Sequence, residues 1–194
     1  MLYRFLQKLE NEGFTTISSS KIAEQLGLGS HNIRKDIGYL GEIGITGSGY
    51  DIKKLKNHIS TNLGLDRGKK ACVVGLGRLG SAIMNFDKFE FNDYQIVAGF
   101  DSNINVLETI KTNIDVYPAY LIPDIVKRFE IELAVITVPE SAAQSVSEKL
   151  IKGGIKGIVN FTPFVIKPTR KNVYIRNIDV ICEFDILSVL ANLS

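Results

Sequence analysis

The sequence is poor in cysteine and has no long hydrophobic run. Its two cysteines, Cys72 and Cys182, are too few for a disulfide framework or a four-ligand zinc site. No apolar stretch reaches the roughly 18 residues that a membrane-spanning helix needs. The first residues, MLYRFLQKLENEG, carry charge early and lack a small-residue cleavage site, which argues against a signal peptide. We therefore expect a cytoplasmic protein that binds no metal and no membrane.

The sequence also lacks a marked excess of positive charge. The formal net charge is +2; residues 1–66 hold 8 basic and 7 acidic side chains, and residues 67–194 hold 15 and 14. Neither part has the strongly basic balance of many nucleic-acid-binding domains. Any interaction with DNA must therefore be argued from motifs and from the local placement of charge.

The hydrophobic pattern changes near residue 68. Before it, apolar residues recur at helical spacing, with three short helices predicted over about 2–12, from Ser18–Ser20 to Gly27, and from Ser30. A glycine-bearing hairpin over 42–52 and a fourth helix over about 52–63 complete the pattern of a winged helix-turn-helix. After it, β-branched runs alternate with helical stretches, which predicts a parallel sheet with crossover helices.

A glycine-rich motif follows the first of these β-branched runs. Gly75, Gly77 and Gly80 form G-x-G-x-x-G between a predicted strand (71–74) and a predicted helix (79–86). In a dinucleotide site the first glycine permits a tight turn, the second admits the pyrophosphate and the third allows close helix–strand packing. A fold that uses these glycines only for packing is the alternative.

Asp101 ends the second predicted strand, 21 residues after Gly80. A carboxylate at this position accepts hydrogen bonds from ribose hydroxyls and repels a 2′-phosphate. The next residues, Ser102-Asn103-Ile104-Asn105, provide no arginine for NADP. The pattern therefore favours NAD(H), with coenzyme A as an alternative ligand of a related fold.

Residues suited to catalysis are missing beside this motif. The histidines, His31 and His58, lie in the N-terminal helical part, and both cysteines lie in apolar surroundings. A dehydrogenase usually needs a general acid or base near the hydride acceptor. We therefore expect a protein that binds a dinucleotide without catalysis, and a small NAD-dependent oxidoreductase is the less favoured reading.

Together these segments resemble the Rex family of redox-sensing transcriptional repressors. The resemblance runs from about residue 2 to residue 190, and its parts are KIAEQLG (21–27), IRKDIGYLGEIG (33–44), GSGYDI (47–52), VVGLGRLGSA (73–82), AGFD (98–101), AVITVPESAAQ (134–144) and GGIKGIVNFTP (153–163). It implies an α/β Rossmann domain with a parallel sheet, preceded by a winged helix-turn-helix domain and followed by a swapped C-terminal helix. The corresponding divisions are 1–66 for DNA binding, 67–177 for NAD(H) binding and 178–194 for dimerisation.

The resemblance also implies a function and partners. Family members are homodimers that bind palindromic double-stranded operator DNA, and NADH closes the dimer and releases the operator. The C-terminal helix, about 179–192, would be exchanged between subunits, and its apolar residues Val180, Phe184, Leu187, Leu190 and Ala191 suit burial. An ordinary packed terminal helix fits the same periodicity.

Site residues follow from the resemblance position by position. The cofactor site comprises Gly75, Gly77, Arg78, Leu79, Gly80, Asp101, Thr137, Pro139, Asn160 and Pro163. The DNA-binding residues are Ser19, Arg34, Lys35, Thr46 and Gly47, with Ser19 as the cap of the second helix and Lys35 as the base-reading lysine. Arg4 and Asp179 match a pair that couples one subunit's DNA domain to the other's C-terminal helix.

The wing departs from the family pattern. Family wings usually carry basic residues between their glycines, whereas this one reads Gly44-Ile45-Thr46-Gly47. The chain also begins without the basic segment that usually precedes the first helix. Each lost cation removes part of the electrostatic attraction to DNA. A dinucleotide- or CoA-binding regulator that has lost operator binding is therefore the alternative function.

Overall fold

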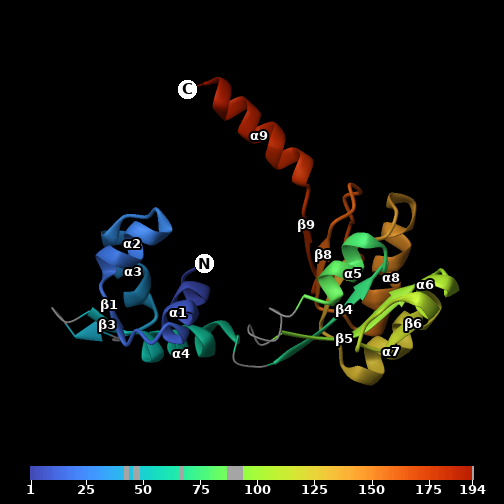
Figure 1. The fold of residues 1–194 in the computed structure, drawn as a ribbon, viewed down its shortest axis with the longest axis horizontal. Helices are drawn as coiled ribbons and strands as arrows, with labels where there is room; N and C mark the ends of the chain where they lie inside the picture. The colour runs from blue at the N-terminus through green and yellow to red at the C-terminus, as the bar shows by residue number, and fades with distance from the viewer. Residues whose placement is uncertain (42–43, 46–48, 66–67, 87–93, 194) are drawn as a thin grey trace. The chain divides into compact units, whose positions relative to one another are not determined.

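The computed structural model describes residues 1–41, 44–45, 49–65, 68–86 and 94–193 (Figure 1). The chain divides into two compact units, Met1–Gly68 and Lys69–Ser194. Over the described ranges, no helix is long and apolar enough to cross a membrane.

The first unit packs helices against a small antiparallel sheet of strand order β1-β3-β2. Its elements are α1 (Leu2–Asn11), β1 (Thr16–Ile17), α2 (Ser19–Leu26), α3 (Ser30–Tyr39), β2 (Gly44–Ile45), β3 (Gly49–Asp51) and α4 (Ile52–Leu63). One apolar core joins all four helices, through Leu6 of α1, Ile22 of α2, Ile33 of α3 and Leu55 of α4. This is the predicted winged helix-turn-helix.

The start of α2 corrects one prediction. Ser18 is the N-cap, and its hydroxyl accepts a hydrogen bond from the backbone N–H of Lys21 at 3.2 Å. Ser19 is the first helical residue and is half-buried. The expectation that Ser19 caps this helix is therefore wrong. All three serines 18–20 are good caps by type, so composition alone did not separate them.

The second unit is built on a parallel sheet of strand order β6-β5-β4-β7-β8-β9 (Figure 1). The elements in chain order are β4 (Lys69–Val74), α5 (Arg78–Met84), β5 (Tyr94–Asp101), α6 (Ile104–Thr109), β6 (Val116–Pro118), η2 (Ala119–Leu121), α7 (Ile122–Phe129), β7 (Leu133–Ile136), η3 (Glu140–Ala142), α8 (Ala143–Gly153), β8 (Gly157–Asn160), β9 (Tyr174–Asn177) and α9 (Val180–Asn192). Numbered along the sheet-forming chain, this is the 3-2-1-4-5-6 order of dinucleotide-binding Rossmann domains. The expected α/β Rossmann architecture is confirmed.

The strand order positions a crevice. Chain progression runs outward from β4 through β5 to β6, then returns to β7 on the other side of β4. Loops that leave neighbouring strands in opposite directions separate at such a reversal, and ligands of open α/β sheets bind there, beyond the carboxyl ends of the strands. The loops after Val74 and Ile136 are therefore where a ligand is expected.

Candidate nucleotide site and DNA-binding surface

The loop after β4 is held by two glycines that have no room for a side chain. Gly75 has a φ of +93°, and a Cβ on it would lie 2.8 Å from the carbonyl carbon and oxygen of Thr137. A Cβ on Gly80 would lie 1.8 Å from the carbonyl oxygen of Gly75. The loop, α5 and the turn after β7 can therefore approach this closely only with glycine at both positions.

Gly77 differs from the other two glycines because its free side is open. A Cβ on it would meet no atom within 4 Å. Gly77 is the N-cap of α5, where the first backbone N–H groups have no partner within the helix. Arg78 and Leu79 follow as exposed residues of the first turn. The surface above Gly77 thus has the space and the donors that a pyrophosphate requires.

Asp101 closes the other side of this loop. Its Oδ2 accepts a hydrogen bond from the backbone N–H of Leu76 at 2.7 Å, and its Oδ1 accepts one from the N–H of Asn103 at 2.8 Å. An ionised carboxylate has about four acceptor positions. Two therefore stay available for ribose hydroxyls while the carboxylate holds the glycine loop, an interaction that the sequence did not reveal.

Thr137, directly after β7, joins the two sides of the crevice. Its hydroxyl lies 2.6 Å from the carbonyl oxygen of Gly75 and 3.2 Å from that of Val74. Pro139, two residues on, is exposed and precedes η3. The Thr137 hydroxyl therefore holds the glycine loop in place through these two hydrogen bonds.

Asn160, at the end of β8, is fully buried, and its side-chain amide hydrogen-bonds to other residues of the protein. Its Nδ2 donates to the carbonyl oxygen of Phe164 at 2.7 Å and to Oδ1 of Asn177 at 2.9 Å, and its Oδ1 accepts from the hydroxyl of Thr162 at 2.8 Å. Asn160 therefore fixes the turn that presents Pro163, which is exposed. A direct contact of Asn160 with a ligand stays a prediction.

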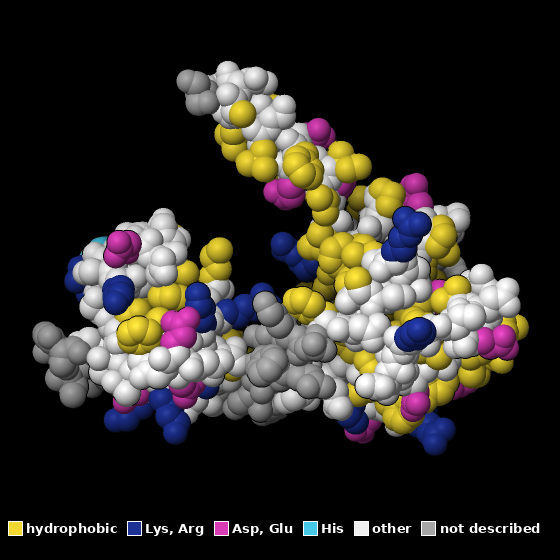
Figure 2. Space-filling model, in the orientation of Figure 1, with side chains coloured by type: hydrophobic (Ala, Val, Ile, Leu, Met, Phe, Trp, Pro, Cys, Tyr) yellow, Lys and Arg dark blue, Asp and Glu magenta, His cyan; other side chains and the backbone are white. Residues whose placement is uncertain are grey.

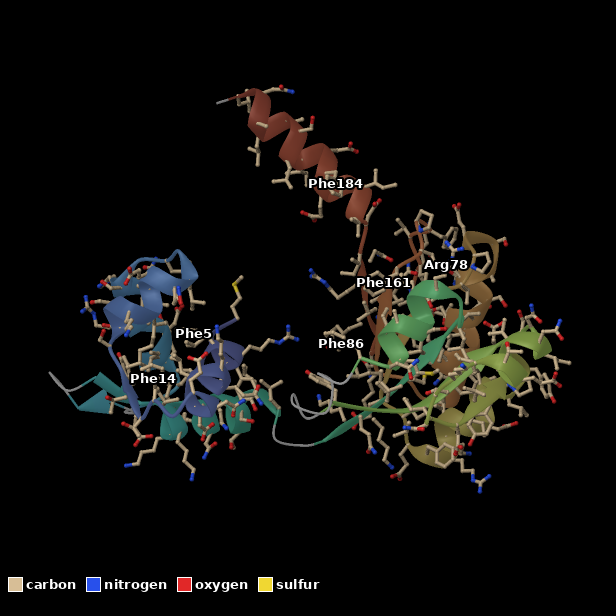
Figure 3. All side chains as sticks on the ribbon, viewed as in Figure 1. Phe5, Phe14, Arg78, Phe86, Phe161 and Phe184 are labelled. Atoms are coloured by element: carbon tan, nitrogen blue, oxygen red, sulfur yellow. The ribbon has the colours of Figure 1, made fainter. Side chains whose placement is uncertain are left out.

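Phe161 was not singled out from the sequence. It follows β8 directly and is half-buried. Figure 3 shows Phe161 and Arg78 at the same edge of the sheet, beyond the strand ends. The signal that could have found it is its position, because residues directly after parallel strands line the crevice.

The outer face of α3 is the candidate DNA-binding surface. Ile33 and Ile37 are buried in the core, so the intervening Arg34 and Lys35 are exposed. This is the placement that a recognition helix needs to reach base edges and phosphates. Of the wing residues that the sequence pointed to, Thr46 and Gly47 lie outside the described residues.

Arg4 and Asp179 lie in different units, and both are exposed. Arg4 is on α1. Asp179 is the N-cap of α9, and its Oδ1 accepts hydrogen bonds from the N–H groups of Ile181 at 3.0 Å and Cys182 at 3.1 Å. Local capping therefore gives Asp179 one clear role, and its coupling with Arg4 stays a prediction.

The last helix, α9, is strongly apolar and entirely exposed. Figure 2 shows hydrophobic side chains along it. Phe184 is 68% exposed, and no residue of the helix is buried. Apolar residues contribute favourable free energy only when they leave water, at about 25 cal/mol per Å². This helix is therefore incomplete without a covering surface.

Neither histidine belongs to the unit that contains the crevice. His31 is exposed on α3, and His58 Nε2 contacts the carbonyl oxygen of Leu40, both in the first unit. Cys72 is fully buried within β4, and this burial raises the pKa of its thiol. In the ranges that the structure describes, no group of three or more His, Cys, Asp or Glu residues could hold a metal ion.

Comparison with known families matches both units. A family model described as "CoA binding domain" matches residues 66–164, and one described as "Putative DNA-binding protein N-terminus" matches residues 1–37.

Two curated relatives cover nearly the whole chain. A redox-sensing transcriptional repressor Rex of Ligilactobacillus salivarius is 36% identical over 190 residues, 98% of this chain and 89% of the relative. One of Carboxydothermus hydrogenoformans is 36% identical over 185 residues, 95% and 88% of the two chains.

Solved structures agree with these relatives. A repressor called RSP, in complex with NAD⁺ and operator DNA, superposes with a TM-score of 0.88 at 28% identity, covering 98% of this chain and 87% of that one. RSP in complex with NADH superposes with a TM-score of 0.84 at 27% identity, covering 98% of this chain and 89% of that one. Another structure describes RSP as a Rex-family repressor. With more than a third of its residues identical to curated members over almost its full length, this chain belongs to the Rex family of redox-sensing transcriptional repressors.

Proposed function

We propose that this protein is a transcriptional repressor that binds operator DNA and releases it when NADH is bound. The observation that carries the proposal is the match over 98% of the chain with a repressor solved on operator DNA with NAD⁺. The same repressor has been solved with NADH. The repressor acts without catalysis, and we place it in the cytoplasm, where DNA and the NAD(H) pool are both accessible.

The crevice of the second unit is the proposed NAD(H) site. The pyrophosphate lies over Gly77 and the first turn of α5, beside Arg78 and Leu79, where the structure has open space and backbone donors. Asp101 accepts hydrogen bonds from the adenosine ribose. Gly75, Gly80 and Thr137 hold the loop, and the turns at Pro139, Asn160 and Pro163 face the nicotinamide half.

The winged helix of the first unit is the proposed operator-binding domain. Lys35 on α3 reaches base edges in the major groove, where an ammonium group donates to the O6 and N7 acceptors of guanine. Arg34 and the half-buried Ser19 contact phosphates, and Thr46 and Gly47 of the wing also bind the DNA. These contacts make binding both sequence-dependent and salt-dependent.

A homodimer follows from α9 in this proposal. The helix needs an apolar cover, and a second copy of the chain supplies one by exchange of α9 between subunits. Dimers also match the two-fold symmetry of palindromic operators. Arg4 of one subunit pairs with Asp179 of the other and so connects the DNA-binding domains to the exchanged helices.

The two nucleotide states differ at the end of the cofactor that α9 would approach. The nicotinamide ring is positively charged in NAD⁺ and neutral in NADH. Covering the ring with an apolar helix costs more free energy when the ring is charged. NADH therefore favours the closed dimer more than NAD⁺ does, and differential affinity of this kind is what a two-state switch requires.

The decisive experiment is fluorescence anisotropy of duplexes labelled with a far-red dye, which keeps the signal clear of NADH fluorescence. A library of two-fold symmetric duplexes is titrated with the protein, then with NADH or NAD⁺. We expect release by NADH and retention with NAD⁺. Tight NADH binding without duplex binding would show instead a nucleotide sensor that has lost operator recognition.

Asp101→Ala provides the matched test of the nucleotide site. Removing a charged acceptor of this kind costs about 1.5–3 kcal/mol, so NADH should bind roughly tenfold to a hundredfold more weakly by calorimetry. Duplex binding without nucleotide should be kept, and release should need correspondingly more NADH. Unchanged NADH affinity would show that Asp101 does not hold the ribose.

Coenzyme A is the second candidate ligand, because the family model matching residues 66–164 is described as a CoA binding domain. Its ADP portion would use the same glycine loop, but the common form carries a ribose 3′-phosphate close to the Asp101 carboxylate. Calorimetric titration with CoA, followed by NADH, separates the two. Displacement of bound NADH by CoA at comparable concentrations would favour the second candidate.

A further inference from the structure

Two exposed lysines, Lys53 and Lys54, stand at the base of the wing. Strand β3 ends at Asp51 and α4 begins at the next residue, so the lysines occupy the first turn of α4. The residues on either side of them in the sequence, Ile52 and Leu55, are fully buried. Both lysine side chains therefore lie on the outer face of α4, with other exposed polar residues.

The position of these lysines opposes the local preference of the helix. The N-terminal end of a helix carries partial positive charge, so lysines there are unfavourable and acidic residues are favourable. The first turn of α4 contains no acidic residue. Asp51, the N-cap, accepts a hydrogen bond from the backbone N–H of Lys54 at 2.8 Å, which stabilises the turn despite the two cations. Helix stability therefore does not explain the lysines.

Charge pairing within the unit does not explain them either. Lys8 pairs with Glu12 at 3.8 Å, and Lys56, on the inner side of α4, pairs with Glu10 of α1. By contrast, neither Lys53 nor Lys54 forms an ion pair with any residue that the structure describes. Both side chains are exposed, so their charges face solvent.

The wing beside them has no positive charge of its own. From Gly41 to Tyr50 the sequence contains no lysine or arginine and one acidic residue, Glu42. Attraction between a protein and duplex DNA depends on cations placed against phosphates. Lys53 and Lys54 are the first cations after the wing in the sequence.

The lysine pair is also fixed to the wing's sheet. The backbone N–H of Ile52 donates to the carbonyl oxygen of Thr15 at 2.9 Å, and β3 pairs with both β1 and β2. A duplex that approached the wing would therefore meet these two charges at a defined place.

We infer that Lys53 and Lys54 bind phosphate groups of duplex DNA beside the wing and supply the electrostatic attraction that the wing itself lacks. This inference rests on the proposed operator-binding function and adds to it a contact region at the start of α4, separate from α3 and from the wing. A lysine acts on a phosphate as a point charge and carries no base information. The contribution is therefore equal for operator and non-operator duplexes.

The test measures duplex affinity against salt concentration for the full chain and for Lys53→Gln/Lys54→Gln. Each lost phosphate contact reduces the slope of log affinity against log salt by about 0.9, so we expect about 1.8 per subunit. At low salt, affinity should fall about tenfold or more for operator and scrambled duplexes alike. The thermal unfolding midpoint should stay unchanged or rise, because the variant removes charges that oppose the helix dipole.

Lys127→Gln/Lys152→Gln is the matched control, since it removes the same charge from exposed positions in the last turns of α7 and α8. Its salt slope should equal that of the unaltered protein. An unchanged slope in the Lys53/Lys54 variant would overturn the inference, as would a loss confined to the operator sequence.

The experiment also separates this inference from the function on which it rests. If the unaltered protein binds duplexes and responds to NADH but the variant keeps its slope, only the lysine contact fails. If the unaltered protein shows no preference for any operator, yet the variant's slope falls, the repressor function fails and the phosphate contact stands. If the unaltered protein binds no duplex, both fail.

Discussion

At the scale of single residues, the three glycines of one motif have different tasks. Gly75 and Gly80 leave no space for a Cβ, whereas Gly77 faces open space with ordinary backbone angles, φ −66° and ψ −165°. A sequence motif weights all three alike. The structure separates two glycines that leave no room for a side chain from one that faces open space, where we propose that the pyrophosphate binds.

The pair Gly80→Ala and Gly77→Ala tests this separation. The Gly80 variant should lose about 1–3 kcal/mol of unfolding free energy, because its Cβ overlaps the Gly75 carbonyl oxygen. The Gly77 variant should lose less stability, because it changes only the N-cap preference of α5, but it should bind NADH more weakly, since its methyl group would occupy the proposed pyrophosphate space. Equal losses of stability in both would contradict the assignment.

The buried thiol of Cys72 makes a second prediction at this scale. Burial raises its pKa, and the thiolate is the reactive form, so Cys72 should stay unreactive toward a disulfide reagent in the folded protein. Raising the pH to about 9, near the pKa of a free thiol, should not change this. In the Cys182→Ser variant, which keeps only the Cys72 thiol, reaction should occur only after denaturation. Rapid reaction of the folded variant would refute the prediction that Cys72 is unreactive.

At the scale of elements, sequence patterns found the strongly periodic segments and missed the weakly marked ones. The helices of the first unit and strands β4, β5, β7 and β8 were all expected. The edge strands β6 (Val116–Pro118) and β9 (Tyr174–Asn177) were not. They are short, β6 ends in proline, and most of β9 is exposed, so neither has the apolar run of a central strand.

The site shows a similar limit. The glycine loop and Asp101 were predicted because motif spacing reflects local chain geometry. The hydrogen bond from Leu76 to Asp101 and the internal network of Asn160 were not predicted. They depend on which loops the sheet order brings together, which no local pattern encodes.

The cap of α2 gives a prediction for one element. Ser18→Ala removes the hydroxyl that accepts the Lys21 N–H and should cost about 0.5–2 kcal/mol of unfolding free energy. Ser19→Ala serves as the control and should change stability by only a few tenths of a kcal/mol, since Ser19 is already helical. Urea unfolding followed by circular dichroism measures both. The reverse order would restore Ser19 as the cap.

At the scale of the whole molecule, α9 is an exposed apolar helix that the proposed dimer would cover. Asp185, Ser188 and Asn192 form a narrow polar stripe along it, and apolar side chains occupy most of the remaining circumference, with Glu183 of the first turn among them. A helix of this kind needs to be enclosed, and the proposed exchange between two subunits encloses it on more than one side.

Phe184→Asp tests this arrangement. Placing a charge on the apolar side should convert dimer to monomer in sedimentation experiments, because an unpaired carboxylate in an interface carries a large desolvation cost. Ser188→Asp adds the same charge on the polar stripe and should leave the dimer intact. A dimer in both variants would show that α9 is not the assembly surface.

The glycine loop has a kinetic consequence. Four hydrogen bonds hold it in place: Gly75 N–H to the Phe100 carbonyl oxygen, Leu76 N–H to Asp101, the Ser81 hydroxyl to the Leu76 carbonyl oxygen, and the Thr137 hydroxyl to the Gly75 carbonyl oxygen. A nucleotide therefore meets a preorganised surface and need not order the loop on arrival. If the proposed function holds, NADH association should be fast, and the delay between a fall in NADH concentration and renewed repression should be set by the rate at which NADH dissociates.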